Sequence, residues 1–374
     1  MIYADNAATT QLDEDAFEAM KPFLLECYAN ASQQYSFAKK VKNALKESRE
    51  TIAECINAEP EEIIFTSGGT ESDNWAVKGF AFSDSGNKAV ITSQIEHHAI
   101  LNSCYEIERL GHPVTYLPVT DKGVITPESL RKYITANTGL VSIMTVNNEI
   151  GTIQNIRVLA EVAHDNGALF HTDAVQAVGH IPVDVKELGI DMMSVSAHKF
   201  NGPKGIGFLY KAKNSPTIRA FHNGGSQEYE LRAGTENIAA IVGMAVALKN
   251  NTSEMEKNII LLNHLSEVFL TELRKSNVDF ILNGHPSDRL PGNINISIKN
   301  RSGEGLMHML DLKGICISTG SACDSVNQRV SHVIQAINIP EAYSEGTIRI
   351  TFGKHNTEVE VIRIAEAIKC ILKL

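Results

Sequence analysis

The chain has 374 residues, of which 43% are hydrophobic and 21% charged, and its formal net charge is -10. This composition is that of a globular protein, and the length exceeds a usual single core, so we expect two domains. The acidic balance, with no basic cluster, argues against nucleic acid and anionic membrane surfaces as partners.

Neither a secretory signal nor a membrane span is predicted. The first residues show no basic segment followed by an apolar one, and the longest apolar run, 238–248, is too short to cross a bilayer. The six cysteines are scattered without a Cys-x-x-Cys pair, which argues against a zinc site or a disulfide framework. We therefore expect a protein of the reducing cytoplasm that binds no metal.

The N-terminal part begins with a small, polar, loop-like stretch at 5–10. Asp13 can cap a helix that runs to about residue 27, and an amphipathic helix is predicted for 36–57. A strand at 62–66 then enters a Gly-Gly turn and a helix. This layout directs backbone N–H groups and a helix dipole at an anion, with a hydroxyl from Thr70, although an ordinary strand-to-helix turn has the same pattern.

Strands and helices then alternate along the chain. This order predicts an α/β domain with a mostly parallel mixed sheet flanked by helices, in which ligands gather at the carboxyl ends of the strands. The expected strands are 88–93, 114–118, 140–146, 168–172, 192–196 and 206–210, and the expected helices are 99–110, 127–134 and 157–166.

The C-terminal part predicts a smaller α+β domain. The polar segment 249–253 is the best boundary candidate, so we expect a large domain at 13–250 and a small domain made of 1–12 and 251–374. The small domain is expected to contain strands at 279–282, 293–298, 315–318 and 347–351, and helices at 254–276, 303–313 and 358–372.

Lys199 lies between two apolar, strand-forming runs, where an unpaired ammonium is costly to bury. We interpret it as a lysine that holds an aldehyde cofactor as a Schiff base. Polar residues follow the neighbouring strands at 96–98, 147–149 and 171–176, and this convergence is harder to explain structurally than a lone histidine.

Such a cofactor, pyridoxal phosphate, needs a lysine, an acid for its ring nitrogen, phosphate donors and a flat group against its face. The sequence offers Lys199, Asp173, His97 and a Gly69-Thr70 turn. Ser196 and His198 flank the lysine as further donors.

Nine motifs in family order make the chain resemble the NifS/IscS-like cysteine desulfurases, within the class V aminotransferases of fold type I. They cover essentially the whole chain, and together they are specific although each alone is weak. The motifs are Ala-Asp-Asn-Ala-Ala-Thr-Thr at 4–10, Thr-Ser-Gly-Gly-Thr-Glu-Ser at 66–72, Glu-His-His-Ala at 96–99, Val-Asn-Asn-Glu-Ile-Gly at 146–151, His-Thr-Asp-Ala-Val-Gln-Ala at 171–177, Ser-Ala-His-Lys at 196–199, Arg-Ala-Gly-Thr-Glu-Asn at 232–237, Gly-Ser-Ala-Cys at 320–323 and Ile-Arg-Ile-Thr-Phe-Gly at 348–353.

The resemblance implies a fold type I pyridoxal phosphate-dependent transferase and a role for each matching residue. Lys199 holds the cofactor and moves protons, Asp173 pairs with the ring nitrogen, Gln176 reaches the phenolic oxygen, and His97 stacks on the ring. The implied phosphate ligands are Gly69, Thr70, Ser196, His198 and, from the second subunit of a homodimer, Thr235.

The resemblance further implies that Asn148, which also borders the cofactor, and Arg349 hold the substrate carboxylate, because a guanidinium matches a carboxylate bidentately. Cys323 is the implied nucleophile and lies in a small, polar loop of the small domain. It takes the sulfur of L-cysteine as a persulfide, which leaves L-alanine, and delivers it to an acceptor protein such as an iron–sulfur scaffold or a thiolation enzyme.

Three loops depart from the family pattern, namely 30–35, 229–230 and 327–332. At 229–230, Tyr229 and Glu230 replace an arginine and a glycine. We expect these departures to alter the choice of sulfur acceptor rather than the chemistry. A selenocysteine lyase, an aminotransferase or another class V enzyme, a desulfurase with an unusual acceptor, and a catalytically idle homologue are the alternatives.

Overall fold

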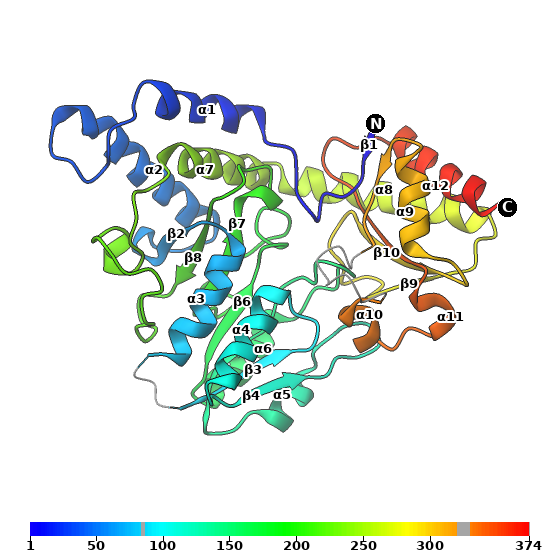
Figure 1. The fold of residues 1–374 in the computed structure, drawn as a ribbon, viewed down its shortest axis with the longest axis horizontal. Coiled ribbons are helices and arrows are strands. Elements are labelled where there is room, and N and C mark those ends of the chain that lie inside the picture. Colours follow the sequence, from blue (N-terminus) through cyan, green and yellow to red (C-terminus); the bar gives the residue numbers. More distant parts are fainter. Residues whose placement is uncertain (84–86, 320–329, 374) are drawn as a thin grey trace.

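The computed structural model describes residues 1–83, 87–319 and 330–373 (Figure 1). A seven-stranded sheet forms its centre, in the order β2-β8-β7-β6-β5-β3-β4. The pairs from β7 to β4 are parallel, and β8 is antiparallel to both β7 and β2. The strands are β2 (Ile63–Thr66), β3 (Ala89–Ser93), β4 (Val114–Leu117), β5 (Thr138–Ser142), β6 (Leu169–Asp173), β7 (Met192–Ser196) and β8 (Gly207–Lys211).

Helices cover both faces of this sheet, because neighbouring residues on one strand point to opposite sides. Phe65 packs into the core beneath α2, α5, α6 and α7, whereas Ile64 packs into the core beneath α3 and α4. The helices are α1 (Glu14–Leu25), α2 (Lys39–Cys55), α3 (Gly69–Ala81), α4 (His98–Arg109), α5 (Pro127–Tyr133), α6 (Ile156–Asp165) and α7 (Ile238–Ser253).

A second core lies beside the first and is built on the antiparallel sheet β12-β10-β9. The N-terminal strand β1 pairs with β11, so residues at the two ends of the chain share this core (Figure 1). Its elements are β1 (Ile2–Tyr3), β9 (Phe280–Leu282), β10 (Asn293–Ile298), β11 (Ile315–Cys316), β12 (Thr347–Thr351), α8 (Met255–Lys275), α9 (Gly303–Asp311), α10 (His332–Ala336), α11 (Glu341–Ser344) and α12 (Glu358–Leu372).

The predicted α/β class and mixed, mostly parallel sheet are confirmed, and two local expectations were wrong. The strand predicted for 140–146 ends at Ser142. The N–H groups of Ile143 and Thr145 still bond to β6, but the N–H of Met144 bonds to the Glu96 carboxylate instead of to a strand. The polar segment 249–253 is the last turn of α7 rather than a loop. Its Asn251 is buried and donates to the carbonyl of Phe200. The division at residue 250 stays a prediction.

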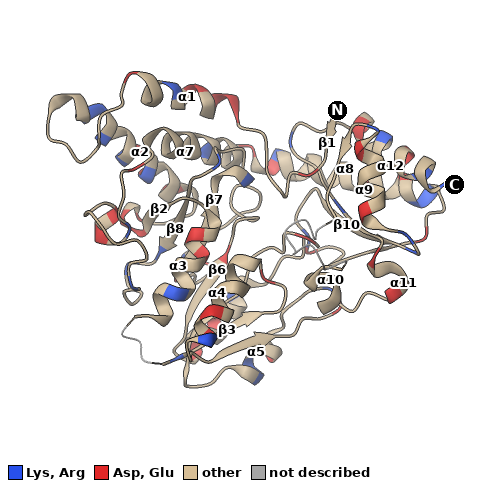
Figure 2. Cartoon of the chain, viewed as in Figure 1, with Lys and Arg blue, Asp and Glu red and all other residues tan. Residues whose placement is uncertain are grey.

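Charged residues of both signs are spread over the outer helices, while the central strands carry few (Figure 2). Among the residues that the structure describes, no helix has the length and apolar character needed to cross a membrane.

Candidate active site

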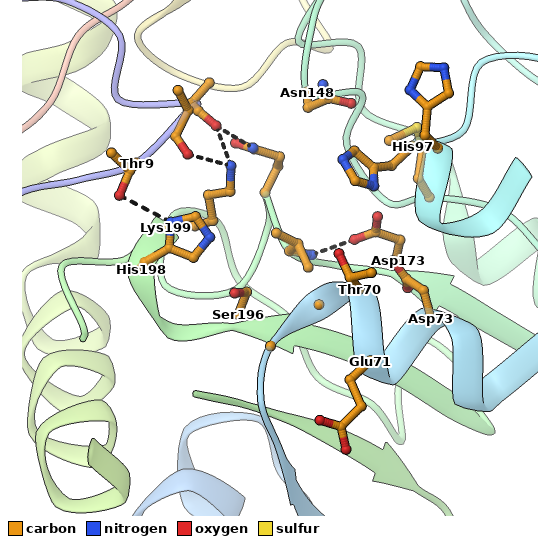
Figure 3. Close-up of a pocket in the computed structure, with 18 of the residues that line it drawn as sticks. Thr9, Thr70, Glu71, Asp73, His97, Asn148, Asp173, Ser196, His198 and Lys199 are labelled. Carbon is orange, nitrogen blue, oxygen red and sulfur yellow. Dashed lines mark hydrogen bonds between the residues drawn. The ribbon is translucent and has the colours of Figure 1, made fainter. Parts of the chain in front are cut away.

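A cavity of about 580 Å³ lies at the carboxyl ends of the central strands, beside the start of α3 (Figure 3). Most of the residues predicted for the site line it. They are Gly69, Thr70, His97, Asn148, Asp173, Gln176, Ser196, His198, Lys199 and Arg349.

Two predicted residues are not among those that the structure describes as lining this cavity. Cys323 falls in 320–329, outside the described residues. Thr235 lines a separate pocket of about 160 Å³ next to the end of β2. The expectation that Thr235 serves the cavity of a second subunit therefore stays a prediction.

Lys199 enters the cavity from η3 (Ala197–Lys199), the short turn that follows β7. Its Nζ donates to the carbonyls of Ala7 and Ala8, at 2.6 and 2.9 Å. Gln176 Nε2 donates to the same Ala7 carbonyl at 2.9 Å. The N-terminal segment thus holds the lysine at the cavity wall.

Asp173 ends β6 and accepts a hydrogen bond from the N–H of Val175, at 2.9 Å. Burial raises the pKa of Asp173 to about 6, against the opposing effects of that hydrogen bond and of the Lys199 charge. At neutral pH the carboxylate is therefore ionised and can pair with a protonated ring nitrogen.

His97 is the N-cap of α4, and its Nδ1 accepts from the N–H of Ala99 at 3.1 Å. Burial, followed by the Lys199 charge, lowers the pKa of His97 to about 4, so the ring is neutral at physiological pH. In Figure 3, His97 and Lys199 border opposite sides of the cavity. A flat, neutral ring at this place suits contact with the face of an aromatic cofactor.

The start of α3 forms the polar end of the cavity. Its N-cap, Gly68, makes no side-chain cap, so the first N–H groups of the helix remain directed at the cavity. A Cβ on Gly69 would lie 2.7 Å from Val175 Cγ2, so a larger residue here would push against Val175. Ser196 and His198 face this end, and His198 Nδ1 lies 3.1 Å from Thr9 Oγ1.

Arg349 reaches the cavity from β12, in the second core. Its Nη1 donates to the Asn148 carbonyl at 3.0 Å and its Nη2 to Asp5 Oδ1 at 2.8 Å. The buried Nε has no hydrogen-bond partner within the described part of the chain. Asn147 holds the Asn148 turn in place, because its side chain accepts from the N–H groups of Glu149 and Ile150.

Sequence reasoning missed several groups at this site. The carbonyls of Ala7 and Ala8 have no side-chain signature. Asp5 belongs to the motif at 4–10, but the motif does not indicate that its carboxylate bonds to Arg349. Lys204 and Asp73 also line the cavity. Asp73 follows Gly69 by one helical turn, and this spacing could have placed it on the same face of α3.

The chain belongs to the aminotransferase class-V family, whose sequence pattern it matches over residues 2–364. It is 48% identical over 373 residues to "Cysteine desulfurase IscS" of Dictyoglomus turgidum, covering 100% of this chain and 94% of that protein. A solved "NifS-like protein" has a TM-score of 0.94 at 35% identity and covers 100% of this chain and 99% of its own. The solved structure "SspA in complex with cysteine" has a TM-score of 0.83 at 34% identity, and the match covers 96% of this chain and 100% of that chain.

These matches confirm the resemblance to the NifS/IscS-like group of the family. Members of the class V family depend on pyridoxal phosphate, and the cavity fits that cofactor. It has a lysine for the aldehyde, a buried carboxylate for the ring nitrogen and an open helix start for the phosphate.

Proposed function

We propose that this chain is a pyridoxal phosphate-dependent cysteine desulfurase. The proposal rests mainly on one observation: Lys199, Asp173 and His97 line the same cavity, and Arg349 of the second core lines it as well. The full-length similarity to proteins named cysteine desulfurase supports the same activity.

The geometry of the cavity supports the residues that would hold the cofactor. The start of α3, with Thr70, Ser196 and His198, would hold the phosphate, Asp173 the ring nitrogen and Lys199 the aldehyde carbon. When bound, pyridoxal phosphate supplies an electron-withdrawing ring that stabilises negative charge at the substrate α-carbon.

The chain's own side chains then act on L-cysteine. Arg349 and Asn148 hold the carboxylate, and Lys199 Nζ takes the proton from the α-carbon and moves it within the site. Cys323 attacks the substrate sulfur: the C–S bond of the substrate breaks and an S–S bond forms on Cys323. One L-cysteine and one thiol give one L-alanine and one persulfide, with no external oxidant.

The partners of the reaction belong to the same proposal. We infer a homodimer in which Thr235 reaches the phosphate of the other subunit, and an acceptor protein that removes the sulfur. The described cysteines, including the exposed Cys370, are all free thiols, which supports work in a reducing cytoplasm.

Replacing Cys323 by Ser tests the sulfur-transfer step. The variant is expected to keep the yellow cofactor but to lose sulfide release from L-cysteine in the presence of a reductant, because a hydroxyl cannot carry a persulfide. Cys370→Ser, which changes an exposed thiol of α12, is the matched control and is expected to retain full release. Full sulfide release by Cys323→Ser would contradict the proposal.

A further inference from the structure

Asp73 is a buried carboxyl group of the cavity that the proposed reaction does not use. It lies in the second turn of α3, is 1% exposed and lines the cavity directly below Asp173 (Figure 3). A side-chain oxygen of Asp73, one of Asp173 and a ring nitrogen of His97 all lie within 4.8 Å of one another.

Ionising both carboxyl groups in a buried site costs a large free energy when they lie this close, because their charges repel across a medium of low dielectric constant. Among the described residues, one cation acts on the pair, and it acts on Asp173: the Lys199 charge lowers the pKa of Asp173 but is not among the influences on Asp73. The proton of the pair therefore belongs on Asp73.

The other titratable groups around Asp73 in the described part of the chain bring no positive charge to it. Burial lowers the pKa of His171 to about 3, and its two nitrogens contact the hydroxyls of Ser142 and Ser194, at 2.9 and 3.0 Å. His97 is neutral for the reason given above, and Glu96 is a further buried acid that disfavours charge on Asp73. Burial, then Asp173, raises the pKa of Asp73 well above its usual range.

The surroundings of Asp73 offer few donors to a charged carboxylate. Burial and the Asp173 charge raise the pKa of Asp73 by more than the Ser194 hydroxyl lowers it. Its Oδ1 has no hydrogen-bond partner among the described residues and lies 4.0 Å from Nε2 of His171. An ionised carboxylate with so few donors would be strongly destabilised in this interior.

We propose that Asp73 and Asp173 form a carboxyl pair that holds one proton, with Asp73 as the protonated positioning residue and Asp173 as the ionised partner of the cofactor ring nitrogen. This inference rests on the proposed pyridoxal phosphate site. Its consequence is that a neutral Asp73 adds no like charge beside Asp173, so Asp173 can stay ionised although it is buried.

Infrared difference spectroscopy of the full-length, cofactor-free protein near neutral pH tests the protonation of Asp73 directly. Subtracting the spectrum of Asp73→Asn from that of the wild type should reveal the loss of a carboxylic acid C=O band. Glu96→Gln is the matched control, because Glu96 is another buried acid with a pKa raised to about 8, and its band should differ in position and be retained in Asp73→Asn. Loss of a carboxylate band in Asp73→Asn would overturn the inference.

Cofactor binding separates this inference from the proposed function. Asp73→Asn keeps a neutral polar group of the same shape, so its dissociation constant for pyridoxal phosphate should lie within ~3-fold of the wild-type value. Asp173→Asn removes a charged hydrogen bond, so its dissociation constant should rise ~10- to 100-fold. Equal binding by Asp173→Asn would overturn the cofactor site. A weakening by Asp73→Asn as large as that by Asp173→Asn would overturn the neutral Asp73.

If Asp73→Asn does not fold, Glu96→Gln decides the question, because it removes the carboxylic acid band of Glu96. A carboxylic acid band that persists in Glu96→Gln through the titration of Asp173, at a pKa of about 6, supports one retained proton. The absence of every such band from Glu96→Gln near neutral pH contradicts it.

Discussion

Arg349 is oriented before any substrate arrives, since Asp5 and the Asn148 carbonyl each take one of its terminal nitrogens. Such a fork is more rigid than a lysine ammonium and presents its donors in one plane. The placement of this side chain, rather than its charge alone, therefore suits it to hold a carboxylate.

Arg349→Lys keeps the positive charge and loses the fork. We expect the KM for L-cysteine to rise ~10- to 100-fold, which corresponds to the loss of a charged hydrogen bond, with no change in cofactor absorbance. Steady-state kinetics measure this rise. The control is Arg363→Lys, at an exposed position of α12, and an unchanged KM in Arg349→Lys would count against the substrate role.

Glu96 makes the stability of the cofactor-free protein depend on pH. Burial raises its pKa from 4.5 to about 8, so the native protein keeps a proton that the unfolded chain has released. The free energy of unfolding should thus fall as pH rises through this window, by on the order of 2 kcal/mol more in the wild type than in Glu96→Gln.

Denaturant titrations from about pH 5 to about pH 8 measure the difference. Glu128→Gln, at an exposed site on α5, should follow the wild type; parallel curves for Glu96→Gln and the wild type would refute the prediction.

At the residue scale, the sequence predicted side chains that belong to motifs and missed groups defined by packing. Lys199, Asp173 and His97 could be found because each follows a predicted strand and has a chemical task. The Ala7 and Ala8 carbonyls could not, because any residue supplies a carbonyl. The burial of Asp73 depends on how α3 lies against β7, which no local pattern specifies.

At the element scale, apolar periodicity placed the longer helices and strands, and it missed the short β1, α10 and α11. Two bounds were wrong where side chains replace backbone partners. β10, β12 and α12 have the predicted bounds. β5 stops early because Glu96, a residue distant in sequence, takes the N–H of Met144. The bound of α7 was misjudged because a polar residue, Asn251, is buried by a long-range hydrogen bond.

The turn η4 (Glu228–Glu230) holds three consecutive non-glycine residues in the left-handed region, at φ values of 45°, 59° and 64°. Glu228 is anchored by Arg49, whose Nη1 and Nη2 lie 2.8 and 2.6 Å from its carboxylate, and by the N–H of Phe65 at 2.8 Å. The buried ion pair therefore keeps in place a backbone conformation that side chains disfavour.

Glu230→Gly should relieve part of this strain. Glycine adopts positive φ without a Cβ penalty, and after its larger chain entropy is counted we expect a gain of about 0.5–1 kcal/mol in the free energy of unfolding. Thermal or denaturant unfolding of the cofactor-loaded protein measures the gain. Glu230→Ala retains the Cβ and is the control that should gain nothing; a gain of equal size in Glu230→Ala would assign the effect to the lost charge.

At the scale of the whole molecule, one chain does not bring Thr235 into its own cavity. Mixed dimers of Lys199→Ala and Thr235→Ala test where Thr235 acts. If Thr235 serves the other subunit, the site of the Thr235→Ala subunit receives an intact Thr235 from the Lys199→Ala subunit and is fully wild type. Since each site acts independently, a mixed dimer should then have about half of the wild-type specific activity. Desulfurase assays on co-expressed, differently tagged subunits measure this, and activity no higher than that of Thr235→Ala alone would place Thr235 in its own chain's site.

The hold of the N-terminal segment on Lys199 has a consequence for the order in which the protein matures. Residues 7 and 8 are held from both sides. Thr10 is bonded to His198 on one side, and on the other the segment is tied to β11 and β12, through the pairing of Ile2 with Ile315 and of Asp5 with Thr351. A ribosome releases Thr351 long after the whole central sheet, so the sheet can fold on the nascent chain while its lysine still lacks these acceptors. Cofactor capture in the finished geometry is thus a step of the completed chain, and a truncation before β12 should yield a folded sheet around an unfinished pocket.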